Sequence, residues 1–263
     1  MSLSNAISKK RIKFVTRVHG YDYDVNRMED KLLPFRDFQM KCVDEIYSVS
    51  KFGVDRIKQE YPQFKEVKLE HLGVNDNGAN ILSEGNQIQI VSCSSLIPLK
   101  RVHLIAEIIS HSTKRIKWTH FGDGPLHDEI QEGLKSLPSN ITCEFKGHVE
   151  NKEVLDFYKS NPVNLFINVS EFEGIPVSIM EAISFGIPVV GCDVCGVPEI
   201  VNDQTGILLS KTFDAEDAYK QIMCFLETDI EKMNKFRASV KDFWYNHFNA
   251  EKNYTKFIEE NLT

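Results

Sequence analysis

Two glutamates, Glu173 and Glu181, flank the start of an expected helix and have seven residues between them. Pro176 is expected as the first helical residue, because its missing N–H has no partner at that position anyway, and Gly186 suits the C-terminal cap. The amides of residues 174–177 carry the positive end of the helix dipole and suit a diphosphate. Ionised carboxylates only accept hydrogen bonds. The two glutamates would therefore bind the hydroxyl groups of a sugar and of a ribose.

The same helix is expected to be apolar on most sides and polar along one narrow stripe. Ser178, Glu181 and Ser184 fall three residues apart, and the positions between them are mostly apolar. This pattern predicts a helix that is buried except along the stripe, which would face water. A second interpretation stays open, in which Glu173 only stabilises the helix dipole and Glu181 reaches solvent.

Lys100 and a glycine-rich turn are further candidates for phosphate binding. A lysine near the start of a helix is disfavoured by the dipole unless an anion lies there, so Lys100 is a candidate diphosphate ligand. Gly122 and Gly124 follow an expected strand at residues 116–121. At that edge of a parallel sheet, glycines allow the backbone to approach a ligand. His127 occupies the place of a third glycine, which weakens a nicotinamide-cofactor interpretation.

The elements that would position these residues alternate between strand and helix. Such alternation predicts parallel sheets with right-handed crossovers, that is, an α/β fold of Rossmann-like, doubly wound type preceded by an incomplete half domain. The expected strands are 11–17, 46–49, 66–72, 87–92, 116–121, 141–145 and 163–169. The expected helices are 33–45, 51–61, 102–109, 151–160, 176–185, 215–227, 230–246 and 248–261.

Composition excludes several classes of protein. The chain has 263 residues and a net charge of −7 (31 basic, 38 acidic), which argues against a nucleic-acid partner. No apolar run approaches the ~20 residues that span a bilayer, and no secretory signal is expected. The six cysteines are scattered, as in a reducing compartment. Cys192 and Cys195 have the spacing of a redox or zinc pair, but no second pair accompanies them.

Four motifs together resemble family 4 nucleotide-sugar glycosyltransferases, which have the two-domain GT-B fold. They are the two glutamates with seven residues between them, Gly-Ile-Pro-Val-Val at 186–190, Gly-Val-Pro-Glu-Ile-Val at 196–201 and Thr-Gly-Ile-Leu-Leu at 205–209. The resemblance implies a retaining hexosyltransferase that takes a sugar from a UDP- or GDP-sugar and passes it to a glycan or lipid-linked acceptor. It implies no metal and no cofactor beyond the donor itself.

The resemblance also assigns residues. It implies catalytic roles for His19, Lys100 and Glu173. It implies donor binding by Ser95, Arg101, Gly122, Gly124, Gly147, His148, Val149, Gly174, Ile175, Pro176, Val177 and Glu181. The chain departs from the family pattern at two of these positions, since Ser95 replaces a common arginine and Arg101 replaces the usual glycine. Arg101 is therefore expected to replace part of the missing positive charge.

The expected division of the chain is a partial acceptor-side domain at 1–74, a linker at 75–86, a nucleotide-sugar-binding domain at 87–246 and a final helix at 247–263 that crosses back. Because the first half of the acceptor domain is missing from the pattern, a partner chain or a dimer that completes it is expected as one alternative. A cytoplasmic location is expected, with contact to the membrane surface left open.

Three rival interpretations remain. In the first, the chain binds a donor but needs a partner chain for turnover. In the second, it is a nicotinamide oxidoreductase. In the third, Asp22 and Asp24 form the metal–diphosphate site of the other large glycosyltransferase fold. His19 also has a simpler interpretation, as a capped histidine in a loop.

Overall fold

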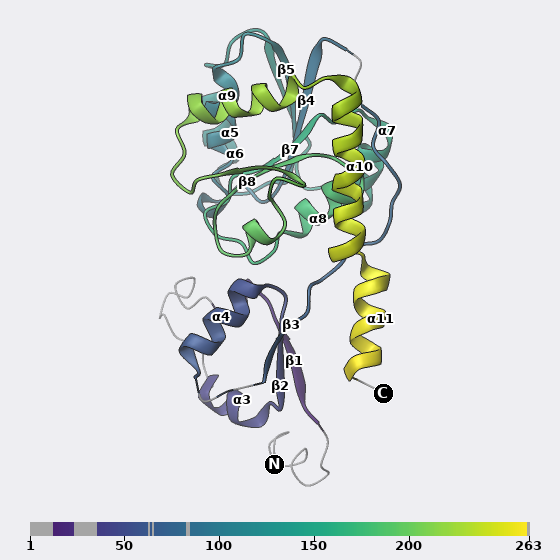
Figure 1. The fold of residues 1–263 in the computed structure, drawn as a ribbon. Helices are drawn as coiled ribbons and strands as arrows, with labels where there is room; N and C mark the ends of the chain where they lie inside the picture. Colours follow the sequence, from purple (N-terminus) through teal and green to yellow (C-terminus); the bar gives the residue numbers. More distant parts are fainter. Residues whose placement is uncertain (1–12, 24–35, 63, 65, 83–84, 262–263) are drawn as a thin grey trace.

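Two parallel β-sheets, each covered by helices, form two lobes stacked one on the other (Figure 1). This computed structural model describes residues 13–23, 36–62, 64, 66–82 and 85–261. Both sheets are parallel throughout, and helices connect most consecutive strands. The α/β class with parallel, Rossmann-like sheets is therefore confirmed.

The first lobe has a three-stranded sheet in the order β1-β2-β3. Its elements are β1 (Val15–Val18), α2 (Gly20–Tyr23), α3 (Arg36–Cys42), β2 (Glu45–Ser48), α4 (Lys51–Glu60) and β3 (Val67–Leu69). Its small core joins Val18, Ile46 and Val67 of the sheet to Val54 and Ile57 of α4. The first and third expected strands are present in shortened form, and the second is shifted by one residue. Residues 11–12 and 33–35 of the first expected strand and helix lie outside the described residues.

The second lobe has a six-stranded sheet in the order β6-β5-β4-β7-β8-β9. Its strands are β4 (Gln87–Cys93), β5 (Arg115–Phe121), β6 (Ile141–Phe145), β7 (Leu165–Asn168), β8 (Val189–Cys192) and β9 (Gly206–Leu209). The first and fourth strands of this lobe, β4 and β7, are neighbours, and the order runs outward from them in both directions. The loops that leave β4 and β7 therefore diverge, and open α/β sheets bind ligands at such a switch point.

Helices cover both faces of the second sheet. They are α5 (His103–Ser110), α6 (His127–Leu134), α7 (Asn151–Ser160), α8 (Val177–Ser184), α9 (Ala215–Leu226) and α10 (Ile230–His247), with short 3₁₀ turns η2 (Pro98–Lys100) and η3 (Val197–Glu199). Helices α5, α6 and α9 lie on one face, and α7, α8 and α10 lie on the other (Figure 1). None of the helices that the structure describes is both long and apolar enough to cross a membrane.

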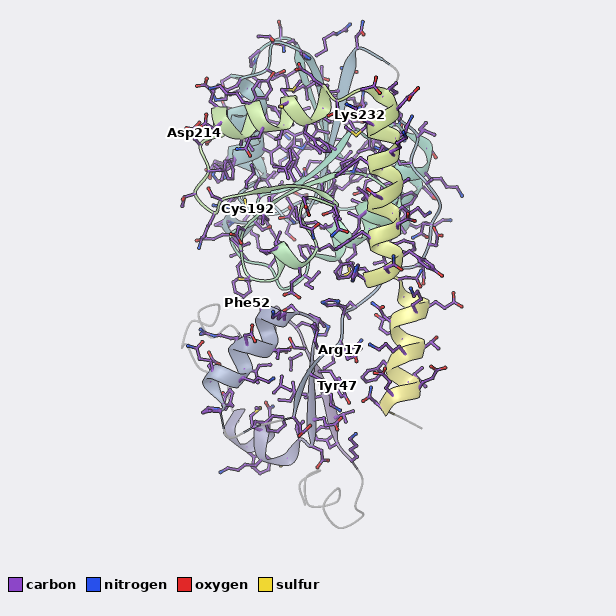
Figure 2. The ribbon with its side chains drawn as sticks, in the orientation of Figure 1. Arg17, Tyr47, Phe52, Cys192, Asp214 and Lys232 are labelled. Atoms are coloured by element: carbon purple, nitrogen blue, oxygen red, sulfur yellow. The ribbon has the colours of Figure 1, made fainter. Side chains whose placement is uncertain are left out.

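The last helix, α11 (Ala250–Asn261), returns to the first lobe, as Figure 1 shows. The Phe257 ring meets the Tyr47 ring edge-on at 4.9 Å, and the Arg17 guanidinium lies 5.0 Å from the Phe257 centroid. Figure 2 shows Arg17 and Tyr47 in this first lobe. The helix that ends the chain thus packs on the sheet that begins it.

The described part of the segment between the lobes contains no helix or strand, but side-chain hydrogen bonds fix one of its residues, Asn80. Asn80 accepts a hydrogen bond from the buried Arg237 side chain at 2.7 Å and another from the Val163 amide at 3.1 Å. Burial lowers the pKa of Arg237 to about 10. Arg237 also donates to the Val163 carbonyl oxygen at 2.9 Å.

Two expectations about α8 are wrong. The helix begins at Val177, and Pro176 is its N-cap residue in an extended conformation (φ −70°, ψ 120°). The polar stripe is not wet, because Glu181 is 8% exposed and Ser184 is fully buried, whereas Val177 is 45% exposed. The physical reason is tertiary packing, because the Asn151 side chain at the start of α7 donates to Glu181 and α10 packs against α8.

Candidate functional site

The switch point of the second sheet brings Lys100 and Glu173 together. Lys100 ends η2 in the loop after β4, and Glu173 lies in the loop after β7. Their side chains form an ion pair, and both are largely buried. The Glu171 amide donates to the Leu99 carbonyl oxygen at 2.8 Å and ties the two loops together. Two residues 73 positions apart in the sequence thus become a single cation–carboxylate pair.

Three glycines pack backbone to backbone beside this pair: Gly20 at the start of α2, and Gly174 and Gly196 in two loops. A Cβ atom on Gly196 would collide with the Gly174 carbonyl oxygen, and one on Gly20 would lie 3.2 Å from the Gly174 nitrogen. Gly174 precedes α8, whose first amides have no partner within the helix. Because Gly20 belongs to the first lobe, the two lobes meet at the N-terminal end of α8, and His19 lies next to that contact.

Glu181 lies in a closed environment behind the ion pair. The Asn151 side chain donates to its Oε1 at 2.8 Å. Burial raises the pKa of Glu181, and the hydrogen bond from Asn151 offsets only part of this effect. Burial also raises the pKa of Cys93 to about 11, and both Glu181 and Lys100 act on that thiol electrostatically. Sequence reasoning missed Asn151, whose only signal was its place at the start of an expected helix.

A buried chain of hydrogen bonds supports the loop that carries Lys100. The Trp118 indole N–H donates to Ser92 Oγ at 2.8 Å, and Ser92 Oγ lies 2.7 Å from His120 Nδ1. His120 Nε2 lies 3.1 Å from the carbonyl oxygen of Ser94. A neutral His120 with its proton on Nε2 satisfies every donor in this chain. Burial lowers the pKa of His120 to about 4, which keeps the ring neutral.

The glycine turn after β5 packs closely against the loop that carries Lys100. Gly122 has φ +131°, and a Cβ atom there would collide with the Ser94 carbonyl oxygen. A Cβ atom on Gly124 would lie 2.6 Å from the carbonyl oxygen of Leu96. The Gly122 amide also donates to the Gly147 carbonyl oxygen at 2.9 Å. The close approach that these glycines allow is therefore made by protein backbone, and their direct contact with a ligand stays a prediction.

Arg101 follows Lys100 at the candidate site, but its guanidinium contacts protein groups instead of facing a phosphate site. Its φ of +48° is left-handed, which explains why glycine suits this position. The guanidinium donates to the carbonyl oxygens of Val169 at 2.8 Å and Lys211 at 3.0 Å, and it contacts Cys192 Sγ at 3.4 Å. Because these donors are already engaged, the structure gives Arg101 the role of holding loops together. The expectation that it faces a phosphate is not supported.

The remaining predicted residues differ in how exposed they are. Ile175 and Pro176 are buried in the loop before α8, whereas Ser95 and His148 are exposed and Val149 is half-buried. The His19 amide donates to the Asp22 carboxylate at 2.7 Å, and its Nδ1 lies 3.5 Å from the same carboxylate. The roles of these residues remain predictions.

The alternative metal and redox sites gain no support from the described residues. Among them, no group of three or more His, Cys, Asp or Glu side chains could hold a metal ion. All six cysteines are free thiols, including Cys192 and Cys195. Asp24 of the rival metal–diphosphate motif lies outside the described residues.

A cavity of about 680 Å³ lies away from all the predicted site residues. It is found where α10 and α11 meet the end of β3, and its lining includes His71, His247, Lys252 and Asn253. Its lining comes mainly from the end of α10 and from α11, and not from the switch point. Because ligands of open α/β sheets bind at that switch point, the Lys100–Glu173 pair is the better candidate for the chemistry.

The chain resembles known glycosyltransferases over most of its length. Residues 75–243 match the family described as glycosyl transferases group 1. A putative colanic acid biosynthesis glycosyltransferase, WcaL of Escherichia coli, is 22% identical over 85% of this chain and 57% of its own length. N-acetyl-alpha-D-glucosaminyl L-malate synthase of Bacillus anthracis is 22% identical over 95% of the chain and 68% of its own. The chain thus spans little more than half of the E. coli relative.

Solved structures share the fold. Anabaena Alr3699/HepE, solved with UDP and glucose, superposes with a TM-score of 0.80 at 16% identity, over 98% of this chain and 73% of the other. A chain of the GtfA/B complex superposes with a TM-score of 0.71 at 16% identity, over 97% and 54%. These likenesses agree with the two-lobed arrangement and the switch-point order. The family match covers well over half of the sequence, and the protein belongs to the group 1 glycosyl transferases.

Proposed function

We propose that this chain binds a nucleoside diphosphate sugar at the switch point and is the donor-binding part of a retaining hexosyltransferase with a glycan or lipid-linked acceptor. The observation that carries the proposal is the Lys100–Glu173 ion pair in front of α8, with Glu181 buried behind it. A cation, free helix amides and two carboxylates within one site match the parts of such a donor, which are a diphosphate and two sets of hydroxyl groups.

Lys100 and the amides before α8 would bind the diphosphate. Their fixed positive charge would stabilise the negative charge that grows on the departing nucleotide, without a metal ion. In the structure, Glu173 neutralises Lys100. When a diphosphate arrives, Lys100 changes partner, and the Glu173 carboxylate becomes free to accept hydrogen bonds from the sugar. Glu181 would accept hydrogen bonds from the ribose.

UDP is the nucleotide to test first. The GtfA subunit of Streptococcus parasanguinis, 25% identical over 62% of this chain, is named as a transferase that uses UDP-N-acetylglucosamine, and HepE was solved with UDP-glucose. These names describe the relatives, and they support a UDP-sugar as the donor here.

A second candidate function is a donor-binding chain that turns over only with a partner. It is favoured by the solved GtfA/B complex, in which two chains assemble. The two candidates differ in turnover of UDP-glucose by the purified chain alone, which only the first predicts.

The experiment is a thermal-shift titration with UDP, GDP and NAD. A ligand at a hundred times its dissociation constant stabilises the folded state by about 2.7 kcal/mol, which raises Tm by about 5–10 °C for a chain of this size. Lys100→Ala should weaken UDP binding about tenfold or more, because a charge-assisted contact is lost. Lys211→Ala is the matched control, since Lys211 pairs with Glu171 on the exposed surface nearby. Stabilisation by NAD alone would refute the proposal, and equal UDP affinity in both variants would refute the role of Lys100.

A further inference from the structure

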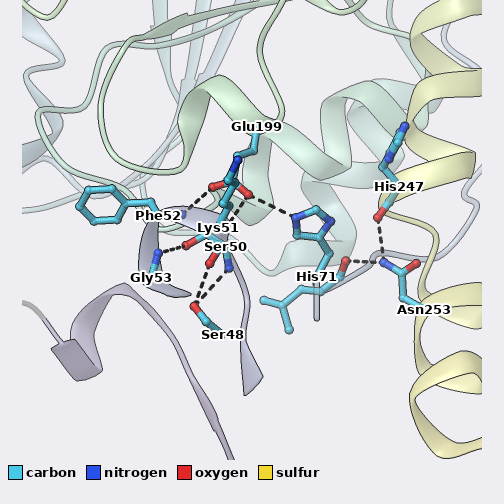
Figure 3. Close-up of polar contacts among 10 residues, drawn as sticks. Ser48, Ser50, Lys51, Phe52, Gly53, His71, Glu199, His247 and Asn253 are labelled. Carbon is cyan, nitrogen blue, oxygen red and sulfur yellow. Dashed lines mark hydrogen bonds and ion pairs between the residues drawn. The ribbon is translucent and has the colours of Figure 1, made fainter. Parts of the chain in front are cut away.

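One side chain of the second lobe reaches the end of a helix in the first. The Glu199 carboxylate, at the end of η3, accepts hydrogen bonds from the amides of Lys51 at 2.8 Å and Phe52 at 3.1 Å. These are the first two residues of α4. His71 follows β3, and its Nε2 atom lies 3.3 Å from the same carboxylate. Figure 3 shows Glu199 between the start of α4 and the His71 ring.

The start of α4 is thus capped from two sources. Ser50, the N-cap residue of the helix itself, accepts a hydrogen bond from the Gly53 amide at 3.0 Å. The two preceding amides would have no partner within the helix, and Glu199 supplies one to both. A carboxylate at this end also interacts favourably with the helix dipole. The lobes are therefore joined by a charge-assisted contact between a side chain and a helix end.

The contact favours an ionised Glu199. Burial alone would raise the pKa of Glu199, but the hydrogen bonds from His71 and from the amides of Lys51 and Phe52 outweigh it, and the pKa is lowered. The carboxylate therefore remains charged at neutral pH, when it binds the helix end most strongly.

The turn that carries Glu199 also contacts the candidate site. Gly196, which precedes η3, packs against the Gly174 carbonyl group, and its amide lies 3.4 Å from the Glu173 carbonyl oxygen. At the far end, the buried Thr205 hydroxyl donates to the Ile200 carbonyl oxygen at 2.8 Å. The short turn that carries Glu199 is held at both ends. Movement of α4 relative to the second lobe would therefore act on the Glu173 loop.

We propose that Glu199 is a positioning residue that holds the first lobe over the donor site by capping α4. By fixing α4, it sets how closely the His19–Gly20 turn approaches Gly174 and Glu173. The Phe52 and Phe172 rings, 6.4 Å apart and edge-on, lie at the same boundary between the lobes. This inference rests on the proposed function, because it concerns the geometry of the same site. The simpler alternative is that Glu199 only adds stability.

The test uses backbone amide NMR of the full chain with the variants Glu199→Gln and Glu199→Ala. Loss of hydrogen bonds to a charged acceptor should make the Lys51 and Phe52 amides exchange about tenfold faster or more. The Gly53 amide, which Ser50 caps, should stay unchanged and serves as the internal reference. If Glu199 sets the lobe position, the amide signals of Gly20 and Gly174 should shift too, although neither residue contacts Glu199 through an observed hydrogen bond.

The control is Asp203→Asn, which removes one negative charge from an exposed residue four positions further along the chain. This variant should leave all of these amides as they are. If Lys51 and Phe52 do not respond to the loss of Glu199, the contact is refuted. If they respond while Gly20 and Gly174 keep their signals, Glu199 contributes stability alone and the positioning role is refuted. Should Glu199→Ala fail to fold, Glu199→Gln, which keeps the shape and one acceptor oxygen, gives the same readout at smaller amplitude.

UDP titration of the same samples separates this inference from the proposed function. UDP is expected to contact the second lobe, so Glu199→Gln should bind it within about twofold of the unaltered chain. If the unaltered chain binds neither UDP nor GDP, the proposed function fails, whereas the amide signals still decide whether Glu199 positions the first lobe.

Discussion

Replacement of His120 tests whether the buried hydrogen-bond chain under the Lys100 loop depends on a neutral imidazole. The ring is fully buried, accepts a hydrogen bond from Ser92 Oγ and donates one to the Ser94 carbonyl oxygen. Protonation would place a second N–H against Ser92 Oγ, which already accepts from Trp118. A charged His120 is therefore disfavoured both by burial and by the direction of the hydrogen bonds.

The magnitude follows from the lowered pKa. Burial moves the pKa of His120 from 6.5 to about 4 in the folded protein. Between these two values the unfolded chain binds a proton that the folded chain does not, so stability falls as the pH falls. The full loss is about 3 kcal/mol, of which about 2 kcal/mol has been lost by pH 5. Above about pH 7.5 this residue gives almost no pH dependence.

The assay is urea unfolding of the unaltered protein and of His120→Gln between pH 7 and pH 5. Glutamine can donate and accept a hydrogen bond but does not titrate. The variant should be less stable at pH 7, and the difference should shrink by about 2 kcal/mol at pH 5, because only the unaltered protein loses the His120 contribution. His103→Gln, at an exposed position on α5, should keep the original pH dependence. A difference between the unaltered protein and His120→Gln that stays constant across this range would refute the reasoning.

Three further substitutions probe the backbone contacts and the linker. Gly196→Ala should lower the free energy of unfolding by about 2 kcal/mol, since its Cβ would collide with the Gly174 carbonyl oxygen. By contrast, Gly133→Ala, in α6 with open space around it, should add about 0.5–1 kcal/mol. Arg237→Ala should cost about 3 kcal/mol in urea unfolding and expose the Asn80 segment to proteolysis, because the donors to that segment are lost. Unchanged stability of Gly196→Ala would contradict the close approach to Gly174, and unchanged stability of Arg237→Ala would contradict the hydrogen bonds to the Asn80 segment.

Much of the fold could be predicted from local patterns. Apolar periodicity and the positions of glycine and proline predict the alternation of strands and helices. Most elements of the second lobe therefore begin and end within a residue or two of the expected bounds. Gly186 was expected as the cap of α8, and its φ of +72° fits that role. Local backbone preferences settle such features, since they depend on neighbours in the sequence.

The surroundings of a side chain were less predictable. The polar stripe of α8 was expected to face water, but Glu181 and Ser184 are buried, and Glu181 lies against Asn151 at the start of α7. Arg101 was expected to face a phosphate, and its donors are taken by carbonyl groups from loops far away in the sequence. Periodicity shows which residues share a face of a helix, but it does not show what covers that face.

The sequence by itself determined the α/β class, the family resemblance and the identity of Lys100, Glu173 and Glu181 as candidates. Only the tertiary structure decided that Lys100 and Glu173 pair at the switch point, that Glu181 is buried against Asn151, and that Glu199 caps a helix of the other lobe. The physical reason is that these contacts join residues 30 to 148 positions apart. They form only when the strand order and the lobe arrangement bring separate loops to one edge.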